Sequence, residues 1–342
     1  MGVRVGVVGG TGYTGGVAAR LVAAHPGLDL AWVTSDKLAG KPLAEHLLMP
    51  AAGAFHPNSE ALELHASCDA VLLATSAEVS AVLGPAFDER GTVVVDLSGA
   101  FRLATAADYT QWYGLEHPAA GWLAKAHYGL PEIFGAPTKG ALVANPGCFA
   151  TAAILALAPL VKAGLVEPSG LIVDGKSGVT GAGRQAKEEY SFSEVDEDAR
   201  AYKLLTHQHT PEMARALGKV GASPNAVTFT AHLLPLRRGL LTTCYARPRP
   251  GTTAARVAEC LADAYAKTPF VHACAPGEAT LKSVTGTNHA KVGATANADM
   301  VVSVAAIDNL LKGAAGQAIQ NLNLLFDLPE TLGLDHLMRV LP

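Results

Sequence analysis

Residues 3–16 read Val-Arg-Val-Gly-Val-Val-Gly-Gly-Thr-Gly-Tyr-Thr-Gly-Gly, and this stretch decides the fold class. Apolar residues 3–8 predict a buried strand, and residues 17–24 predict a helix. Between them lies a Gly-x-Gly-x-x-Gly pattern in strand–loop–helix order. In that order the glycines permit a tight turn, and the backbone and helix N-terminus can approach a pyrophosphate. The stretch therefore predicts a dinucleotide site with contacts from Gly10, Thr11, Gly12, Tyr13, Thr14 and Gly15.

Strand and helix signals keep alternating through the first half of the chain. Apolar runs predict strands at 28–34, 70–74, 92–96 and 141–144, and residues 78–87 predict a helix. Alternation at this spacing predicts an α/β fold with a doubly wound, Rossmann-type parallel sheet. The carboxyl ends of such strands line the cofactor crevice. That position adds Thr75 and Ser98 to the residues expected at the cofactor.

The end of the second predicted strand bears on the choice of cofactor. An NAD-specific site carries an acid about 20 residues beyond the glycines, on the ribose 2′-hydroxyl. This chain has Thr34-Ser35-Asp36-Lys37 there. Hydroxyl groups and a lysine suit a 2′-phosphate, so we predict NADP, bound by Ser35 and Lys37. Asp36 weakens that prediction and keeps NAD open as the alternative.

A cysteine follows a turn in the middle of the chain, in Asn145-Pro146-Gly147-Cys148. The Pro-Gly pair ends the preceding strand, and the Ala/Leu-rich run to residue 161 predicts a helix that starts at about Cys148. The positive end of a helix dipole lowers the pKa of a thiol from its usual value of about 8.5. Cys148 is therefore a candidate nucleophile, and a buried structural cysteine is the alternative.

Two histidines precede another predicted helix, in Thr206-His207-Gln208-His209-Thr210. Pro211 and Glu212 suit a first helical turn, with Thr210 as the N-cap. His209 would then lie at the junction of loop and helix, where it is a candidate general acid and base. A structural histidine is the alternative. Upstream, the glycine-rich residues 175–184 predict a flexible loop that can approach a ligand.

The second half predicts a different kind of sheet. Strands are expected at 170–174, 226–234 and 239–247, with two more within 281–307 and a helix over 253–267. Long strands without regular intervening helices predict a mixed or antiparallel sheet, which is a common subunit interface. We expect a Rossmann domain over 1–147, completed by a C-terminal helical segment over 313–342. A catalytic and dimerisation α/β domain over 148–312 is expected between them.

Composition excludes several classes of function. The net charge is −4 and no basic stripe occurs, so nucleic-acid binding is not expected. No apolar run reaches the roughly 18–20 residues of a membrane span, and no signal peptide precedes the first strand. Five widely spaced cysteines without a CxxC pair indicate neither disulfides nor a metal site. A reducing, cytoplasmic compartment follows as the expected location.

Several motifs together resemble the N-acetyl-gamma-glutamyl-phosphate reductase family, the semialdehyde-forming dehydrogenases of arginine biosynthesis. The resemblance spans nearly the whole chain and rests on the glycine loop, Asn-Pro-Gly-Cys-Phe-Ala-Thr, His-Gln-His-Thr-Pro-Glu and Asp-Asn-Leu-Leu-Lys-Gly. It implies a second domain of the glyceraldehyde-3-phosphate dehydrogenase type, NADPH as cofactor and a homodimer or homotetramer. It also implies Cys148 as nucleophile, His209 as acid/base and Asn309 near the nicotinamide.

The substrate implied by this resemblance is a small acyl phosphate, for which we expect contacts from Arg102, Arg184 and Glu212. The family often shows Ser-Ala-Asp-Phe-Arg where this chain has Ser-Gly-Ala-Phe-Arg at 98–102, and Arg102 is retained. One alternative is the related reductase of lysine biosynthesis, which acts on a carrier-protein-linked aminoadipyl phosphate and lacks the Asn-Pro-Gly. Another is a non-catalytic NADPH-binding sensor, which would need neither Cys148 nor His209.

Overall fold

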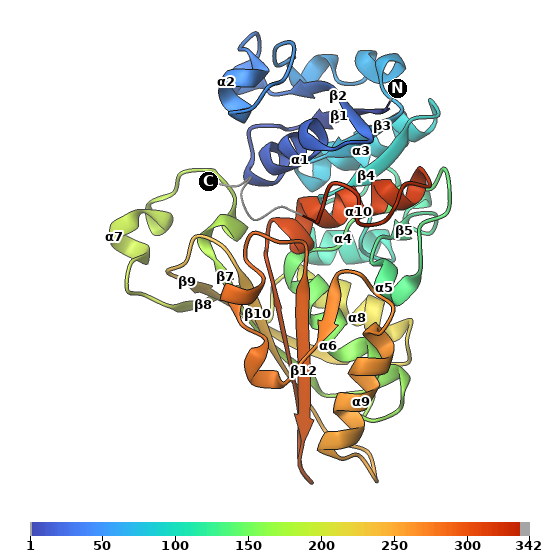
Figure 1. Cartoon of the computed structure of the whole chain (residues 1–342), viewed down its shortest axis with the longest axis vertical. Coiled ribbons are helices and arrows are strands. Elements are labelled where there is room, and N and C mark those ends of the chain that lie inside the picture. The colour runs from blue at the N-terminus through green and yellow to red at the C-terminus, as the bar shows by residue number, and fades with distance from the viewer. Residues whose placement is uncertain (1, 336–342) are drawn as a thin grey trace. The chain divides into compact units, whose positions relative to one another are not determined.

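The computed structural model describes residues 2–335 and divides into two compact units (Figure 1). The first unit contains the chain up to Gly147 together with the chain from Ala314 onward. The second unit is Cys148–Gly313. The boundary before Cys148 places the last strand of the first sheet and the cysteine helix in different units.

The first unit is built on a parallel sheet of six strands in the order β2-β1-β3-β4-β6-β5. Every residue of β3 is buried, as expected where helices cover both faces of a parallel sheet. The α/β fold predicted for this half is confirmed. The two-residue strand β5 was not predicted, because it is too short to show a period. The strands are β1 (Val3–Val8), β2 (Leu28–Thr34), β3 (Ala70–Leu73), β4 (Val93–Asp96), β5 (His127–Tyr128) and β6 (Val143–Ala144).

The first helix follows the glycine loop and begins at Tyr13, four residues before the predicted start. Gly15 explains the difference. A Cβ atom at this position would lie 2.2 Å from the Gly9 carbonyl oxygen, so only glycine lets the helix start this close to β1. The helices of the first unit are α1 (Tyr13–Ala24), α2 (Leu43–Leu47), α3 (Ala77–Asp88), α4 (Ala106–Tyr113), α5 (Pro131–Phe134) and α10 (Gly316–Leu325).

The C-terminal helical segment is shorter than the predicted range of 313–342. A π-helical turn at Leu311–Ala315 leads into α10, which packs against α1 and β4 and ends at Leu325. Asp327 then adopts a left-handed conformation with φ of 55°, and Pro329 follows without an N–H group. Both features stop a helix. Residues 336–342 lie outside the described part of the chain.

The second unit is built on a mixed sheet of seven strands in the order β11-β12-β13-β10-β7-β9-β8. Buried and less buried residues alternate along β10, so one face of this sheet packs against a core. Helices α6, α8 and α9 cover that face. The predicted mixed sheet is therefore confirmed. Its elements are α6 (Cys148–Lys162), β7 (Leu171–Gly178), α7 (Phe192–Val195), β8 (Arg200–Tyr202), α8 (His209–Gly218), β9 (Val227–Leu234), β10 (Leu240–Ala246), α9 (Ala254–Tyr265), β11 (Val271–Ala273), β12 (Ala290–Ala296) and β13 (Val301–Ile307).

Three local predictions in this unit were wrong. Residues 175–178 are not a flexible loop but the end of β7, because Gly175 makes room for the Phe149 ring, which a Cβ atom there would approach to 2.5 Å. The first of the two strands expected within 281–307 begins only at Ala290, after a 3-10 turn at Leu281–Ser283. Thr210 is not an N-cap, since α8 already begins at His209.

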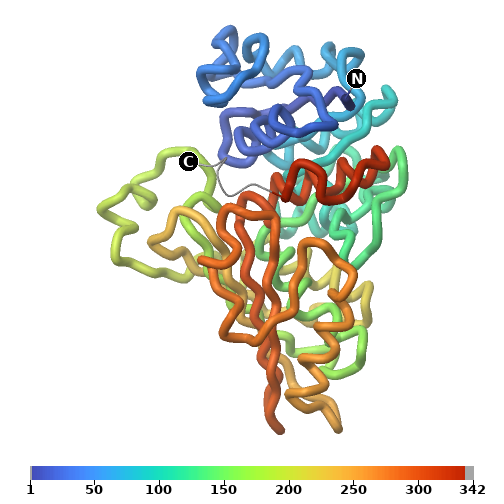
Figure 2. Tube along the Cα trace, in the orientation of Figure 1, coloured from blue at the N-terminus to red at the C-terminus, as the bar shows by residue number. Residues whose placement is uncertain are grey.

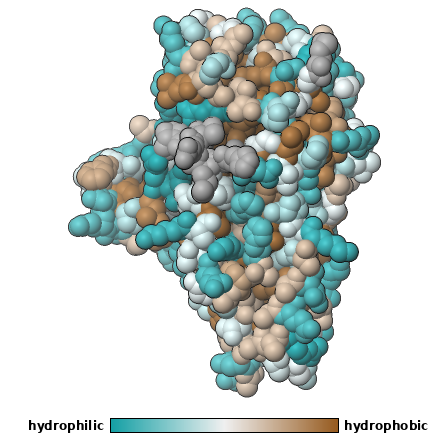
Figure 3. All heavy atoms as spheres, in the orientation of Figure 1, coloured by the Kyte–Doolittle hydropathy of each residue, from teal (hydrophilic) through white to brown (hydrophobic). Residues whose placement is uncertain are grey.

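The chain between β7 and β8 leaves the sheet and returns to it. This segment, residues 183–199, carries α7 and projects from the rest of the second unit (Figure 2). Hydrophilic and hydrophobic residues lie side by side on its surface (Figure 3). Among the described residues, no helix combines the length and the apolar character needed to cross a membrane.

Candidate active site

Cys148 is the first residue of α6 and is only partly buried, whereas every residue of this helix from Phe149 to Val161 is buried. The neighbouring Phe149 anchors the helix start: its ring packs over Gly175, and its centroid lies 5.1 Å from that of Phe229. The buried helix thus supports, at its N-terminal end, a residue that is partly open to solvent. Cys148 therefore has the setting expected of a nucleophile.

The other four cysteines have a different environment. Burial raises the pKa of the Cys68 thiol to about 11 and that of Cys244 to about 12. Burial also raises the pKa of Cys260 and of Cys274. A thiolate is the reactive form of cysteine, so these four side chains are poor nucleophiles at neutral pH.

A glycine from a distant part of the chain presses against the cysteine. A Cβ atom on Gly313 would lie 2.8 Å from the Cys148 Cβ and 3.2 Å from the Asp308 carbonyl oxygen. Gly313 belongs to the π-helical turn Leu311–Ala315, and its N–H donates to the same Asp308 oxygen over 2.9 Å. Single π-helical turns are frequent at functional sites. Here the turn brings a residue without a side chain against Cys148.

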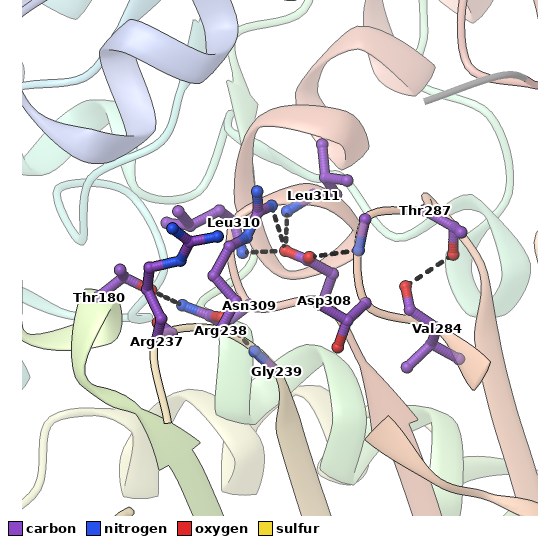
Figure 4. Close-up of polar contacts among 12 residues, drawn as sticks. Thr180, Arg237, Arg238, Gly239, Val284, Thr287, Asp308, Asn309, Leu310 and Leu311 are labelled. Atoms are coloured by element: carbon purple, nitrogen blue, oxygen red, sulfur yellow. Dashed lines mark hydrogen bonds and ion pairs between the residues drawn. The ribbon is translucent and has the colours of Figure 1, made fainter. Parts of the chain in front are cut away.

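The buried carboxylate of Asp308 organises the chain before this turn (Figure 4). Its Oδ1 accepts from the Arg238 guanidinium at 2.7 Å and from the Leu310 and Leu311 N–H groups at 2.9 and 3.0 Å. Its Oδ2 accepts from the Gly286 N–H at 2.8 Å. Arg238 is itself almost buried, so the loss of either charge would leave the other buried without its partner.

Asn309, the predicted nicotinamide contact, is held at both ends of its amide. Its Oδ1 accepts from the Gly239 N–H at 2.9 Å, and its Nδ2 donates to the Thr180 hydroxyl at 3.0 Å (Figure 4). Thr180 in turn donates to the Arg237 carbonyl at 2.7 Å. Two other segments of the second unit, around Thr180 and around Gly239, thus fix the orientation of this side chain.

The two histidines of the His-x-His motif are not equivalent. Their ring centroids lie 4.7 Å apart, and the His209 N–H donates to the His207 Nδ1 at 3.1 Å. An acceptor nitrogen carries no proton. Burial, with a smaller contribution from His209, lowers the pKa of His207 to about 2. His207 is therefore neutral at cellular pH and caps the start of α8, which leaves His209 as the candidate acid/base.

His209 lies beside a buried acid. The His209 Nε2 and the Glu212 Oε2 are 4.0 Å apart, one helical turn along α8, and Glu212 is fully buried. The Phe149 ring also contacts His209, with centroids 6.1 Å apart. A carboxylate beside an imidazole holds the ring in position and stabilises its charged form. The structure places Glu212 against His209, where the sequence alone placed it only near the substrate.

In the first unit, two residues predicted to bind the cofactor already contact each other. The Ser35 hydroxyl donates to the Thr11 hydroxyl over 3.3 Å. Lys37 is exposed on the following 3-10 turn. Asp36, the acid that weakened the NADP prediction, is engaged by Asn58, whose backbone and side-chain N–H groups donate to its two oxygens at 2.7 and 2.8 Å.

The other predicted residues of the first unit lie at strand ends. Thr75 shares a hydrogen bond of 2.8 Å with Ser80, and the Ser98 hydroxyl donates to Asp96 at 2.9 Å. Arg102 is nearly buried, and its guanidinium donates to the carbonyls of Asn145 and Leu97, both at 2.8 Å. These two bonds fix the guanidinium beside the chain that leads to the cysteine.

The chain is similar over nearly its full length to proteins named as N-acetyl-gamma-glutamyl-phosphate reductases. It is 41% identical over 343 residues to the N-acetyl-gamma-glutamyl-phosphate reductase of Magnetococcus marinus, with 98% of each chain covered. It is 43% identical over 352 residues to the enzyme of that name from Halorhodospira halophila, with 99% of each covered. The chain belongs to the N-acetyl-gamma-glutamyl-phosphate reductase family.

Two family models divide this reductase chain in the same way as its structure. Residues 4–141 match the NAD binding domain of semialdehyde dehydrogenases, and residues 148–309 match their dimerisation domain. Aspartate semialdehyde dehydrogenase II from Vibrio cholerae shares the fold, with a TM-score of 0.70 at 18% identity over 96% of this chain and 99% of that one. The NADP complex of the Candida albicans enzyme has a TM-score of 0.63, at 16% identity over 95% and 99% of the two chains.

Sequence reasoning missed part of the second-unit site. Asp308 is visible in the Asp-Asn-Leu-Leu motif, but nothing in the sequence pairs it with Arg238, 70 residues away. Nothing in the sequence places Gly313 against Cys148 either. Arg184, predicted at the substrate, is exposed on the projecting segment. In the described chain, no three His, Cys, Asp or Glu side chains form a group that could hold a metal ion.

Proposed function

We propose that this reductase converts N-acetyl-gamma-glutamyl phosphate and NADPH into N-acetylglutamate 5-semialdehyde, NADP and phosphate, a step of arginine biosynthesis. One observation carries the proposal: Cys148 starts a buried helix, and the next residue, Phe149, packs against both His207 and His209. The identity of 41% to 43% with enzymes named for this reaction supports the choice of substrate. We also propose a homodimer or homotetramer, because residues 148–309 match a dimerisation domain.

The match to an NAD binding domain supports a nicotinamide cofactor, and we propose NADPH. The glycine loop and the N-terminus of α1 would hold the pyrophosphate. Ser35 and Lys37 would hold the 2′-phosphate, while Asn58 engages the competing acid Asp36. When bound, this cofactor supplies the hydride. Comparable catalytic efficiency with NADH and NADPH would overturn the assignment of Ser35 and Lys37.

In the first step the Cys148 thiolate attacks the acyl carbonyl and phosphate leaves with the bonding electron pair, which gives a thioester. Backbone N–H groups at the start of α6 would stabilise the oxyanion. Arg102 and Arg184 would bind anionic groups of the substrate. His209, oriented by Glu212, would accept the thiol proton.

In the second step His209 would donate the proton that neutralises the oxygen of the thiohemiacetal, which the hydride supplied by the cofactor would generate from the thioester. The same imidazole then takes the proton back as the carbon–sulfur bond breaks. The aldehyde leaves and the thiolate is restored. Asn309, clamped by Gly239 and Thr180, would orient the carboxamide of the nicotinamide.

The reverse reaction tests this function. With NADP⁺ and phosphate, we expect catalytic efficiency with N-acetylglutamate semialdehyde to exceed that with N-acetylaminoadipate semialdehyde by at least about tenfold, since one extra methylene misplaces the reacting carbon. Formation of NADPH is followed by absorbance. A preference for the longer semialdehyde would favour the lysine-type reductase. Absence of any phosphate-dependent oxidation despite NADPH binding would favour the sensor.

Gly313→Ala tests whether this glycine positions the nucleophile. We expect kcat to fall about 100-fold, because the new methyl group displaces Cys148 and a 1 Å displacement of a reacting group can cost that much. KM and NADPH affinity should change less than threefold. Gly218→Ala at the end of α8 is the matched control, since a Cβ atom there meets nothing within 4 Å. An unchanged kcat in Gly313→Ala would refute the positioning role.

A further inference from the structure

The second unit contains a cavity that the mechanism above does not use. Its volume is about 250 Å³. It lies between the projecting segment, β8 and the loop that precedes α8. Lys187, Arg200 and Lys203 line it, with Glu189 as its one acidic lining residue. Tyr202 and His207 also line it.

In this region, most basic side chains line the cavity and most acidic side chains do not. Residues 183–203, which extend from the projecting segment through β8 to Lys203, carry four basic side chains and six acidic ones. This stretch as a whole is therefore acidic. Three of the four basic residues line the cavity, but only one of the six acidic residues does. A net positive lining on an acidic segment creates a local field that attracts an anion.

The backbone holds one of these cations in an uncommon conformation. Lys203 has φ of 46° and Leu205 has φ of 58°, both in the left-handed region that side chains other than glycine, asparagine and aspartate seldom adopt. The Lys203 ammonium donates to the Gln208 amide oxygen at 2.9 Å. Backbone strain of this kind is retained where the placement of a side chain matters.

Two contacts connect the cavity with the nucleophile. His207 packs on Phe149, the residue after Cys148, with ring centroids 5.8 Å apart. Tyr202 packs on His207 with centroids 5.7 Å apart. Burial raises the pKa of Tyr202, and the charge of Cys148 raises it further. A substrate bound to Cys148 would thus have this cavity as a neighbour.

We infer that the cavity is the subsite for the carboxylate of the acyl phosphate substrate, the charged group remote from the reacting carbonyl, and that Lys203 and Arg200 are its ligands. The inference rests on the proposed function and adds the residues that bind the carboxylate of the acyl group. Recognition of a carboxylate by lysine and arginine is a charge-assisted contact. The phosphoryl group is the competing anion, and the experiment below distinguishes the two.

The test is the reverse reaction of the full-length enzyme, with separate KM values for N-acetylglutamate semialdehyde and for inorganic phosphate. We expect Lys203→Met to raise the KM for the semialdehyde about 10- to 100-fold, the usual effect of losing one charged hydrogen bond, with the KM for phosphate unchanged. Lys203→Arg should stay within about threefold of the original enzyme. The exposed Lys267→Met, next to α9, is the control for loss of a surface charge.

A second experiment uses a substrate that lacks the carboxylate, as a complement to the variant that lacks the lysine. With N-acetyl-4-aminobutanal, which lacks the carboxylate, the original enzyme and Lys203→Met should have the same KM. A rise in the KM for phosphate, or an equal rise for both aldehydes, would overturn the assignment. An unchanged KM for N-acetylglutamate semialdehyde would also overturn it. Because the original enzyme is measured in the same assay, failure of the proposed function would appear separately, as absence of activity in every variant.

Discussion

Cys148→Ser is expected to lower kcat by at least about 10⁴-fold. A serine hydroxyl is a weak nucleophile at neutral pH, and the alkoxide is a poor leaving group when the hemiacetal collapses, so both chemical steps fail. The measurement is a rapid-quench experiment without cofactor, in which the original enzyme should release one equivalent of phosphate per active site and Cys148→Ser none. The start of α6 is anchored by Phe149, so the variant should keep its melting temperature within a few degrees.

Cys274→Ser is the matched control for this prediction. Cys274 is also partly buried, but burial raises its pKa and it packs against an apolar cluster formed by Ala279, Val284 and Ala306. It should retain full activity. A stoichiometric phosphate burst in Cys148→Ser would contradict the thioester mechanism, because phosphate release would then need no sulfur at position 148.

His209→Asn has the second largest expected effect, a fall in kcat of about 10²- to 10⁴-fold, which is the usual range for the loss of a general acid and base. Asparagine fills a similar volume and can donate a hydrogen bond, but it cannot carry a proton between the thiol, the oxygen and solvent. Cys148 should remain in place. The decisive measurement is the rate of Cys148 alkylation by iodoacetamide from pH 5 to pH 9. The dependence of this rate on pH should differ between the original enzyme and the variant, because His209 no longer accepts the thiol proton.

His207→Asn is the control for this experiment. His207 is neutral at cellular pH, because burial lowers its pKa to about 2, and its Nδ1 accepts the His209 N–H. An asparagine oxygen can accept the same hydrogen bond. We therefore expect less than a tenfold loss of kcat and an unchanged alkylation profile. A larger loss in His207→Asn than in His209→Asn would reverse the roles given to the two histidines.

The elements that could be predicted were those with a local signal. Adjacent residues are enough to predict the glycine loop at residues 9–16, the Pro-Gly turn before Cys148 and the alternating strands. The start of α1 was misjudged because Gly15 in a helix is explained by its contact with the Gly9 backbone rather than by helix propensity. Gly175 was misjudged in the same way, because Phe149 occupies the space of its missing side chain.

The α/β fold, a nucleotide-binding domain and the candidates Cys148 and His209 could be recognised from the sequence, because strands, turns and helix starts are set by neighbouring residues. The contacts that hold these groups became visible only in the folded chain. It paired Asp308 with Arg238, set Glu212 beside His209, pressed Gly313 against Cys148 and gathered Lys203 with Arg200 in one cavity. Two of these contacts, Asp308 with Arg238 and Gly313 with Cys148, join residues far apart in the chain, and no local pattern encodes a distance that arises only when the sheets and helices pack.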